Sequence, residues 1–286
     1  MIRWFAIAMV FLLTSACATQ SETRSSDTVG TEESPTFQTS FRQALIQAQS
    51  KHYGMAQAFA ETALALAESD MQNYQVRHLL VDVHGRQGHW DVVAQFAGEA
   101  AAIIRSSPNL SSRLMVMASH MEAERARAAY QMGQTQIVQA SNAQMIEDHP
   151  DAGELWQPVG VDGAEHEAGL SCPLLRQGYL RFDVYDGNFE APGCEYWGHN
   201  DVGARVFLGD VVASEEDQLV ARSATDMPVN IDLGDTLNIS SQWQVRSGVT
   251  AFVATNADSS ITLTLQFPDG QRDAAEQFAR ELAVSD

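Results

Sequence analysis

The sequence predicts an α+β protein of several domains, in which a helical first part precedes an antiparallel β-sandwich. Apolar residues recur at helical spacing between Phe41 and Ile146. From Gly178 onward, short runs of alternating apolar and polar residues are separated by turn residues. The two parts also differ in charge, because residues 36–150 carry 8 basic and 10 acidic side chains, whereas residues 151–286 carry 7 and 23.

The first residues have the pattern of a bacterial export signal. Met1-Ile2-Arg3 gives a short basic start, and Trp4–Ala16 is uncharged and almost wholly apolar. As a helix this stretch would reach about 20 Å, short of the ~30 Å hydrocarbon core of a bilayer. It is therefore predicted to be the core of a signal peptide and not a spanning helix.

The segment Leu13-Thr14-Ser15-Ala16-Cys17 resembles the lipobox of bacterial lipoproteins, in which small residues precede a cysteine that is diacylated. The family usually has a branched aliphatic residue where this chain has Thr14. The resemblance implies a lipoprotein signal peptide over residues 1–17 and palmitate-type acyl chains on Cys17. Because Ala18 and not aspartate follows, it also implies an outer-membrane location facing the periplasm, with surface orientation left open. Ordinary secretion without a lipid is the alternative.

Residues 18–36 are predicted to be a flexible tether. Gln20–Pro35 is rich in Ser, Thr and Glu, and its only large apolar residue is Val29. Such a segment cannot bury enough apolar surface to offset the entropy of ordering it. A lipid on Cys17 would then hold the folded body about 20–25 Å from the membrane.

Residues 37–152 are predicted to form helical hairpins. Each apolar run of helical period is followed by a glycine and a second run, and the glycines Gly54 and Gly88 are 34 residues apart. The runs are Phe41–His52, Met55–Ala67, Leu79–Val83 and Trp90–Ala101. A third unit is weaker, because Gly133 follows Gly88 by 45 residues.

This 34-residue helix-turn-helix period, with small residues in the second helix, resembles the tetratricopeptide repeat (TPR). The alternative is an irregular helical bundle. The resemblance implies TPR-like α-hairpins whose first helices line a groove for an extended peptide or a partner helix. The residues expected near that peptide groove are Arg42, Gln49, Gln75, Arg77, His78 and Asp82.

Residues 153–286 are predicted to form an acidic β-sandwich that ends in a helix over Asp273–Ala283. The expected strands are Tyr179–Tyr185, Ala204–Leu208, Leu219–Ala221, Val229–Leu233, Thr236–Gln242, Thr250–Ala254 and Ile261–Phe267. Cys172 and Cys194 are the two cysteines outside the leader. In an exported chain such a pair predicts a disulfide, worth about 3 kcal/mol of stability on the loop-entropy estimate.

Several groups of side chains could bind a ligand. Asp183, Asp186, Asn188 and Asp201 could supply oxygen ligands for calcium, but the favoured interpretation is that they are turn aspartates and solvated charges. Tyr196, Trp197 and Trp243 could stack on sugar rings or belong to the core. His84 and His89, and His120 and Glu124, do not complete a three-ligand metal set. The sequence contains no catalytic motif.

These patterns predict a non-enzymatic, lipid-anchored envelope protein that acts as a protein–protein interaction scaffold through its TPR-like groove and β-sandwich. Its partner would be an envelope protein, and a chain with a formal charge of −20 is not expected to bind nucleic acid. The alternative is a glycan- or calcium-binding β-sandwich module with a helical spacer, and an envelope hydrolase is favoured less. No cofactor is expected, apart from calcium in that alternative.

Overall fold

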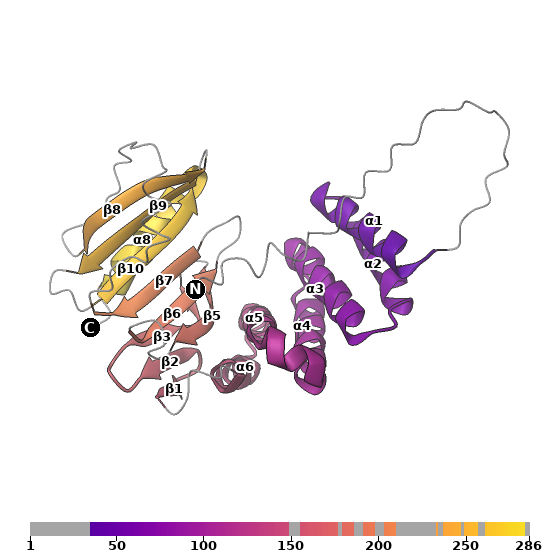
Figure 1. Ribbon diagram of the computed structural model, residues 1–286, viewed down its shortest axis with the longest axis horizontal. Helices are drawn as coiled ribbons and strands as arrows, with labels where there is room; N and C mark the ends of the chain where they lie inside the picture. Colours follow the sequence, from indigo (N-terminus) through magenta and orange to yellow (C-terminus); the bar gives the residue numbers. More distant parts are fainter. Residues whose placement is uncertain are drawn as a thin grey trace. The chain divides into compact units, whose positions relative to one another are not determined.

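The computed structural model describes residues 35–148, 155–176, 179–185, 191–197, 203–209, 233, 237–246, 249–256 and 261–283 (Figure 1). Cys17 and the predicted tether, apart from Pro35 and Thr36, lie outside these residues. Residues 36–286 form one compact unit, with helices first and antiparallel sheets after them. Among the helices described, none combines the length and apolar character needed to cross a bilayer.

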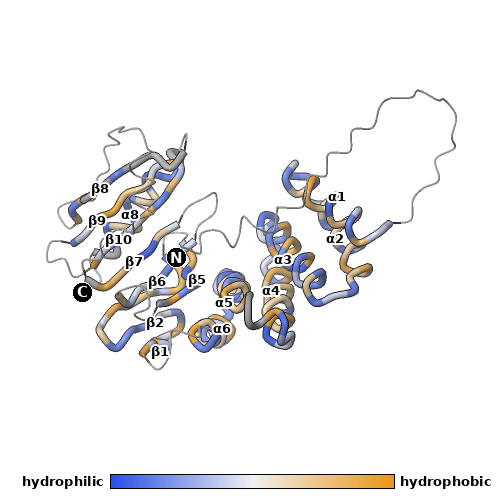
Figure 2. The backbone as a smooth tube through the Cα atoms, viewed as in Figure 1, coloured by the Kyte–Doolittle hydropathy of each residue, from blue (hydrophilic) through white to orange (hydrophobic). Residues whose placement is uncertain are grey.

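The helical part consists of helices that pack in sequence-adjacent pairs. The second helix of each of the first two pairs also packs against the first helix of the next pair. Figure 2 shows apolar residues recurring along each of them. The helices are α1 (Phe37–Gln49), α2 (Tyr53–Ala65), α3 (Asp70–Gln87), α4 (Trp90–Ser106), α5 (Pro108–Gln131) and α6 (Thr135–Asp148).

Local sequence explains where several of these helices begin and end. Thr36 caps α1 in a capping box with Thr39, and Ser69 caps α3 in the same way with Gln72. Gly88 ends α3 in the left-handed conformation that glycine adopts without strain. Capping residues thus fix the boundaries that apolar periodicity leaves open.

The turns predicted at Gly88 and Gly133 are present, whereas the first turn differs from its prediction. Gly54 lies inside α2, and the left-handed residue of the first turn is Lys51, with φ of 60°. The turns of the second and third pairs have Gly88 and Gly133 at positive φ. These three residues are 37 and 45 apart, so the 34-residue offset between two glycines is not the offset between turns. Pro108 is the first residue of α5.

Small residues allow the helices to approach closely. Ala56, Ala60 and Ala63 of α2 are fully buried in one apolar cluster with residues of α1 and α3. A second cluster joins α3, α4 and α5, and includes Ala118 and Met121 of α5. The small residues noted in the sequence therefore serve helix packing.

The described strands form two antiparallel sheets. The three-stranded sheet has the order β1-β2-β3, and the seven-stranded sheet has the order β4-β5-β6-β7-β10-β9-β8. Their bounds are β1 (Trp156–Val159), β2 (Gly163–His166), β3 (Ser171–Pro173), β4 (Leu175–Arg176), β5 (Tyr179–Tyr185), β6 (Gly193–Trp197), β7 (Gly203–Leu208), β8 (Leu237–Arg246), β9 (Val249–Asn256) and β10 (Ile261–Pro268).

Five of the predicted strands correspond to β5, β7, β8, β9 and β10, and the predicted closing helix is α8 (Arg272–Ala283). Leu219–Ala221 lies outside the described residues, as does Val229–Leu233 except for Leu233. The sequence did not predict β1 to β4 or β6. The short strands β1 to β3 thus add a second sheet before the predicted ones.

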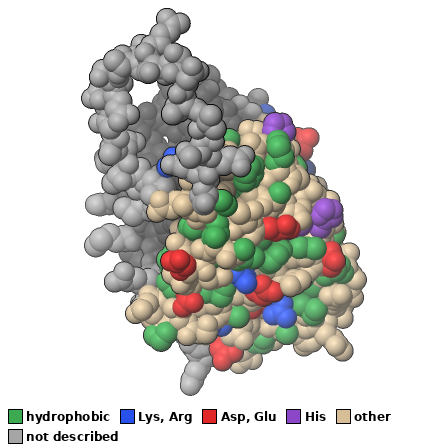
Figure 3. All heavy atoms as spheres, turned by 90° about the vertical axis from the view of Figure 1, so that its right-hand side faces the viewer, with side chains coloured by type: hydrophobic (Ala, Val, Ile, Leu, Met, Phe, Trp, Pro, Cys, Tyr) green, Lys and Arg blue, Asp and Glu red, His purple; other side chains and the backbone are tan. Residues whose placement is uncertain are grey.

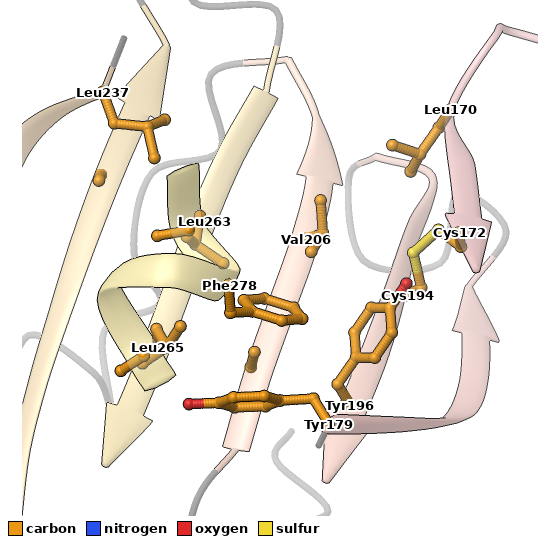
Figure 4. Close-up of a cluster of buried hydrophobic side chains, with 14 of the residues drawn as sticks. Leu170, Cys172, Tyr179, Cys194, Tyr196, Val206, Leu237, Leu263, Leu265 and Phe278 are labelled. Carbon is orange, nitrogen blue, oxygen red and sulfur yellow. A yellow bond between two sulfur atoms is a disulfide. The ribbon is translucent and has the colours of Figure 1, made fainter. Parts of the chain in front are cut away.

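A disulfide and an aromatic cluster hold the two sheets and α8 together. Cys172 of β3 is bonded to Cys194 of β6, with their Cα atoms 6.5 Å apart, so the predicted disulfide is present (Figure 4). Phe278 of α8 packs against Tyr179 and Tyr196, with ring centroids 4.4 and 5.3 Å away. One buried cluster includes residues of all three elements.

Helix α5 contributes to the cores of both parts of the chain. Ala118 and Met121 belong to the cluster with α3 and α4, whereas Ala123 and Ala126 belong to a cluster that contains Phe182 of β5. Ser119 also donates a hydrogen bond of 2.9 Å from Oγ to the carbonyl oxygen of Phe182. The helical part and the sheet are thereby packed directly against each other.

Candidate functional site

Five aromatic side chains from α3, α5, β5 and β6 form a continuous row, which we name the histidine–aromatic row. The ring of Tyr74 stacks on His78 at 5.9 Å, and His78 meets His120 edge-on at 5.9 Å. His120 in turn contacts Phe182 at 6.2 Å, and Phe182 contacts Trp197 at 5.9 Å. All four are distances between ring centroids within the range of favourable aromatic pairs. The row links the helical part to the sheet.

The two histidines of the row are neutral at neutral pH. Burial lowers the pKa of His78 to about 4, and the neighbouring His120 adds to that effect. Burial and then the charge of Arg127 lower the pKa of His120 to about 4. A neutral imidazole next to Phe and Trp presents an aromatic surface that can also donate or accept a hydrogen bond.

Three of the five members of the row keep part of their surface exposed, whereas Tyr74 and Phe182 are buried. The side chain of His120 keeps 22% of its surface exposed, and His78 and Trp197 are half-buried. Among the described residues, none offers a hydrogen-bond partner to His120 Nδ1. That nitrogen is itself inaccessible to solvent, so it is an unpaired polar atom of the interior, which is costly.

Charged side chains lie beside the row on α5. Glu124 Oε1 is 4.0 Å from His120 Nε2, and Glu124 also pairs with Arg127. The Arg127 guanidinium lies 5.5 Å from the ring centroid of Trp90, a favourable cation–π distance. The contact between Arg127 and Trp90 holds α5 against α4. Glu124 and Arg127 place one acidic and one basic side chain beside the row.

The structure brings one of the predicted groove residues, His78, into the row. Arg42 and Gln49 are exposed on α1, and Gln75 is half-buried on α3. Arg77 forms an ion pair with Glu99 of α4 at 2.8 Å, and Asp82 pairs with Arg86 at 2.9 Å. The ion pairs of Arg77 and Asp82 are thus formed with neighbouring helical residues.

Only some of the candidate calcium and glycan residues lie in the described part of the chain. Asp183 lies on β5, while Asp186, Asn188 and Asp201 lie outside the described residues. In the part that is described, no three His, Cys, Asp or Glu side chains are placed to hold a metal ion. Tyr196 is buried in the core, and the side chain of Trp243 is outside the description. Trp197, in contrast, belongs to the row.

A buried acidic cluster lies near the row on the same sheet. Glu195 of β6 is opposite Asp183 of β5 and opposite Arg205 of β7. Arg205 Nη2 is 3.3 Å from Glu195 Oε1, and the hydroxyl of Tyr185 donates to Glu195. Burial raises the pKa of Glu195 to about 7, while Arg205 opposes that shift and Asp183 adds to it. Such a group titrates near neutral pH.

Sequence reasoning did not identify Phe182 or Glu195 as site residues. It noted His120 and Glu124 only as an incomplete metal set, and it could not know that α5 brings His120 against β5. The one available signal for Glu195 was an acidic residue between Cys194 and two aromatics, a pattern that fits a buried strand. Compared with protein-family models, with curated proteins and with solved structures, the chain matches none of them.

Proposed function

We propose that this protein is a lipid-anchored envelope scaffold that binds a protein partner without catalysing a reaction. Acylation of Cys17 would hold it at the outer membrane facing the periplasm. Its helical pairs would act as TPR-like repeats of unequal length, and the sheets as a sandwich-like platform packed against them. The partner would be another envelope protein and not a nucleic acid.

The observation that carries the proposal is the continuity of the histidine–aromatic row across both parts of the chain. Interfaces between proteins are enriched in aromatic side chains at their centres and depleted of charge there. The row has both properties, because its histidines are neutral and its charged neighbours Glu124 and Arg127 pair with each other. An extended segment of a partner lying along it would contact helices and sheet together.

Affinity purification of the full chain from detergent-solubilised envelopes tests this function. His120→Ala and Trp197→Ala alter two distant members of the row, while His52→Ala removes an exposed histidine at the α1–α2 turn as a matched control. We expect the same partner with the unchanged chain and with His52→Ala, and at least about a tenfold loss with the other two, equal to 1.4 kcal/mol. Thermal unfolding of each variant confirms that the chain is folded.

Two results would contradict the proposal. Recovery of the same partner in equal amount with His120→Ala and Trp197→Ala would move the binding surface elsewhere. Mass spectrometry of the mature protein showing an unacylated first residue, or a chain that still carries Met1, would remove the membrane anchor.

The half-buried Trp197 favours one second candidate, a glycan-binding surface on the sheet. An exposed indole can stack on a sugar ring, and the same row would then hold a saccharide in place of a peptide. Titration calorimetry of the full chain with peptidoglycan fragments, and separately with calcium, distinguishes these ligands. Heat that is lost in Trp197→Ala would support the glycan, and heat with calcium alone would support a metal site.

A further inference from the structure

Helix α2 carries apolar residues on both its buried and its exposed side, with Glu61 also exposed. Glu61 is the only charged residue in Tyr53–Ala65. The buried side consists of alanines. On the exposed side, Met55 and Phe59 keep 49% and 36% of their surface accessible, and Ala58 and Ala65 are exposed with them. We name Met55, Ala58, Phe59 and Ala65 the α2 stripe, since their spacing places them along one side of the helix.

A helix with apolar residues all round is normally buried. In the described part of the chain, however, the α2 stripe stays exposed. Figure 3 views the molecule from the side of α1 and α2 and shows apolar side chains on this face among scattered charges. The residues between Cys17 and α1 are poorly suited to cover the stripe, because Gln20–Pro35 has Val29 as its only large apolar residue.

The charge around the stripe differs from the charge of the chain. Residues 36–70 contain Arg42 and Lys51 against Glu61, Glu68 and Asp70, a net charge of −1, whereas the whole chain has a formal charge of −20. Lys51 is exposed at the turn that precedes α2, four residues before Met55. Exposed apolar side chains next to a basic residue suit an anionic phospholipid surface, with the base at the headgroups.

The position of the stripe in the chain also favours a membrane. Cys17 precedes the first residue of α1, Phe37, by 20 residues, and a flexible chain of that length has an end-to-end distance of about 25 Å. An acylated chain would therefore keep α2 close to the bilayer at a high effective concentration. A small apolar contact, too weak to hold a free protein, suffices under that condition.

We propose that the α2 stripe docks on the phospholipid surface that carries the acyl anchor, with Lys51 among the headgroups. The proposal rests on acylation of Cys17, which is part of the proposed function. Docking through α2 would give the scaffold a defined orientation and not free rotation on its tether.

Site-specific fluorescence on the full acylated chain tests the contact. An environment-sensitive probe is attached to Ala58→Cys in the stripe, and to Ala102→Cys, an exposed alanine of α4, as the matched control. The two remaining cysteines of the body are joined in the disulfide and do not react. The labelled proteins are reconstituted in vesicles of phosphatidylethanolamine and phosphatidylglycerol and compared with detergent-free protein lacking the leader and Cys17.

We expect probe emission at Ala58→Cys to rise severalfold and shift to shorter wavelength on the vesicles, with little change at Ala102→Cys. Adding Met55→Glu and Phe59→Glu should abolish the change while the protein still floats with the vesicles. Flotation without any change at Ala58→Cys would overturn the docking and leave the anchor intact. Failure to float would instead refute the anchor and the docking together. A change that follows protein concentration in the absence of lipid would assign the stripe to a second copy of the chain.

Discussion

The buried guanidinium of Arg181 leads to a prediction about what fixes the helical part to the sheet. Arg181 is 1% exposed, and its Nη1 donates to the carbonyl oxygen of Cys172 while its Nη2 donates to Oδ1 of Asn142. Asn142 of α6 also donates from Nδ2 to the carbonyl oxygen of Gly163 at 2.7 Å. One amide side chain therefore connects α6, β5 and β2. Burial lowers the pKa of Arg181 to about 10, which reflects how costly its charge is there.

Replacing Asn142 with leucine keeps a similar volume but removes both hydrogen bonds. A lost bond to a buried charged group costs about 1.5–3 kcal/mol, and an unpaired carbonyl adds about 1 kcal/mol or more. We therefore expect Asn142→Leu to lower the free energy of unfolding by about 3–5 kcal/mol. Asn142→Asp loses the same bond to Gly163 but places a carboxylate beside the guanidinium, so it should cost less than the leucine.

Urea unfolding of the oxidised protein at pH 7, followed by tryptophan fluorescence, measures these differences. The double variant Arg181→Met/Asn142→Leu removes the charge together with its partner, so its cost should be smaller than the sum of the two single costs. Strictly additive costs, or a loss below about 0.5 kcal/mol for Asn142→Leu, would refute the reasoning, because either result means that the guanidinium does not depend on the amide.

Three further predictions concern the row, the acidic cluster and a close backbone approach. The pKa of His120 is lowered to about 4 in the folded protein, so this imidazole binds a proton more readily in the unfolded chain. The free energy of unfolding should therefore fall by up to about 3 kcal/mol as the pH drops from 6.5 to 4. His120→Asn should reduce that loss in thermal melts, while His78, whose pKa is also lowered to about 4, keeps its own contribution. The pKa of Glu195 is raised to about 7, so the folded state holds its proton more tightly and stability should fall as pH rises from 4.5 to 7. Glu195→Gln should remove this fall, and an unchanged profile would argue against a buried carboxyl. Gly193→Ala would place a Cβ 2.5 Å from Phe207 Cδ1 and should lower the melting temperature, whereas Gly270→Ala, with open space around it, should not.

Much of the fold could be predicted from periodicity, and two of the three helical turns from their glycines, but the first turn could not. Apolar spacing indicated all six N-terminal helices, and alternation indicated five strands of the large sheet. The first turn was placed at Gly54 because glycine is the usual left-handed residue, whereas the structure uses Lys51. A strained lysine leaves no signal in the sequence. Strand β6 was not predicted because its outer positions, which alternate with the core residues Cys194 and Tyr196, hold Glu195 and the aromatic Trp197. Its outer face is therefore not consistently polar.

The candidate site depended on contacts that no local pattern encodes. His78, His120 and Phe182 are separated by 42 and 62 residues, and they meet only because α5 packs between α3 and β5. The sequence indicated His78 through its place in a predicted groove and Trp197 through its side-chain chemistry. Nothing in the sequence indicated that His78 and Trp197 belong to the same site, because they lie in different predicted domains.

Helix α5 belongs to two apolar clusters, one shared with the helices and one with the sheet, and this limits how the chain can be divided into fragments. Separating the chain between α6 and β1 would remove the sheet from one side of α5 and expose Ala123, Ala126 and Phe182 to water. Neither fragment would keep its full interior, so we expect the helices and the sheets to melt in a single cooperative transition.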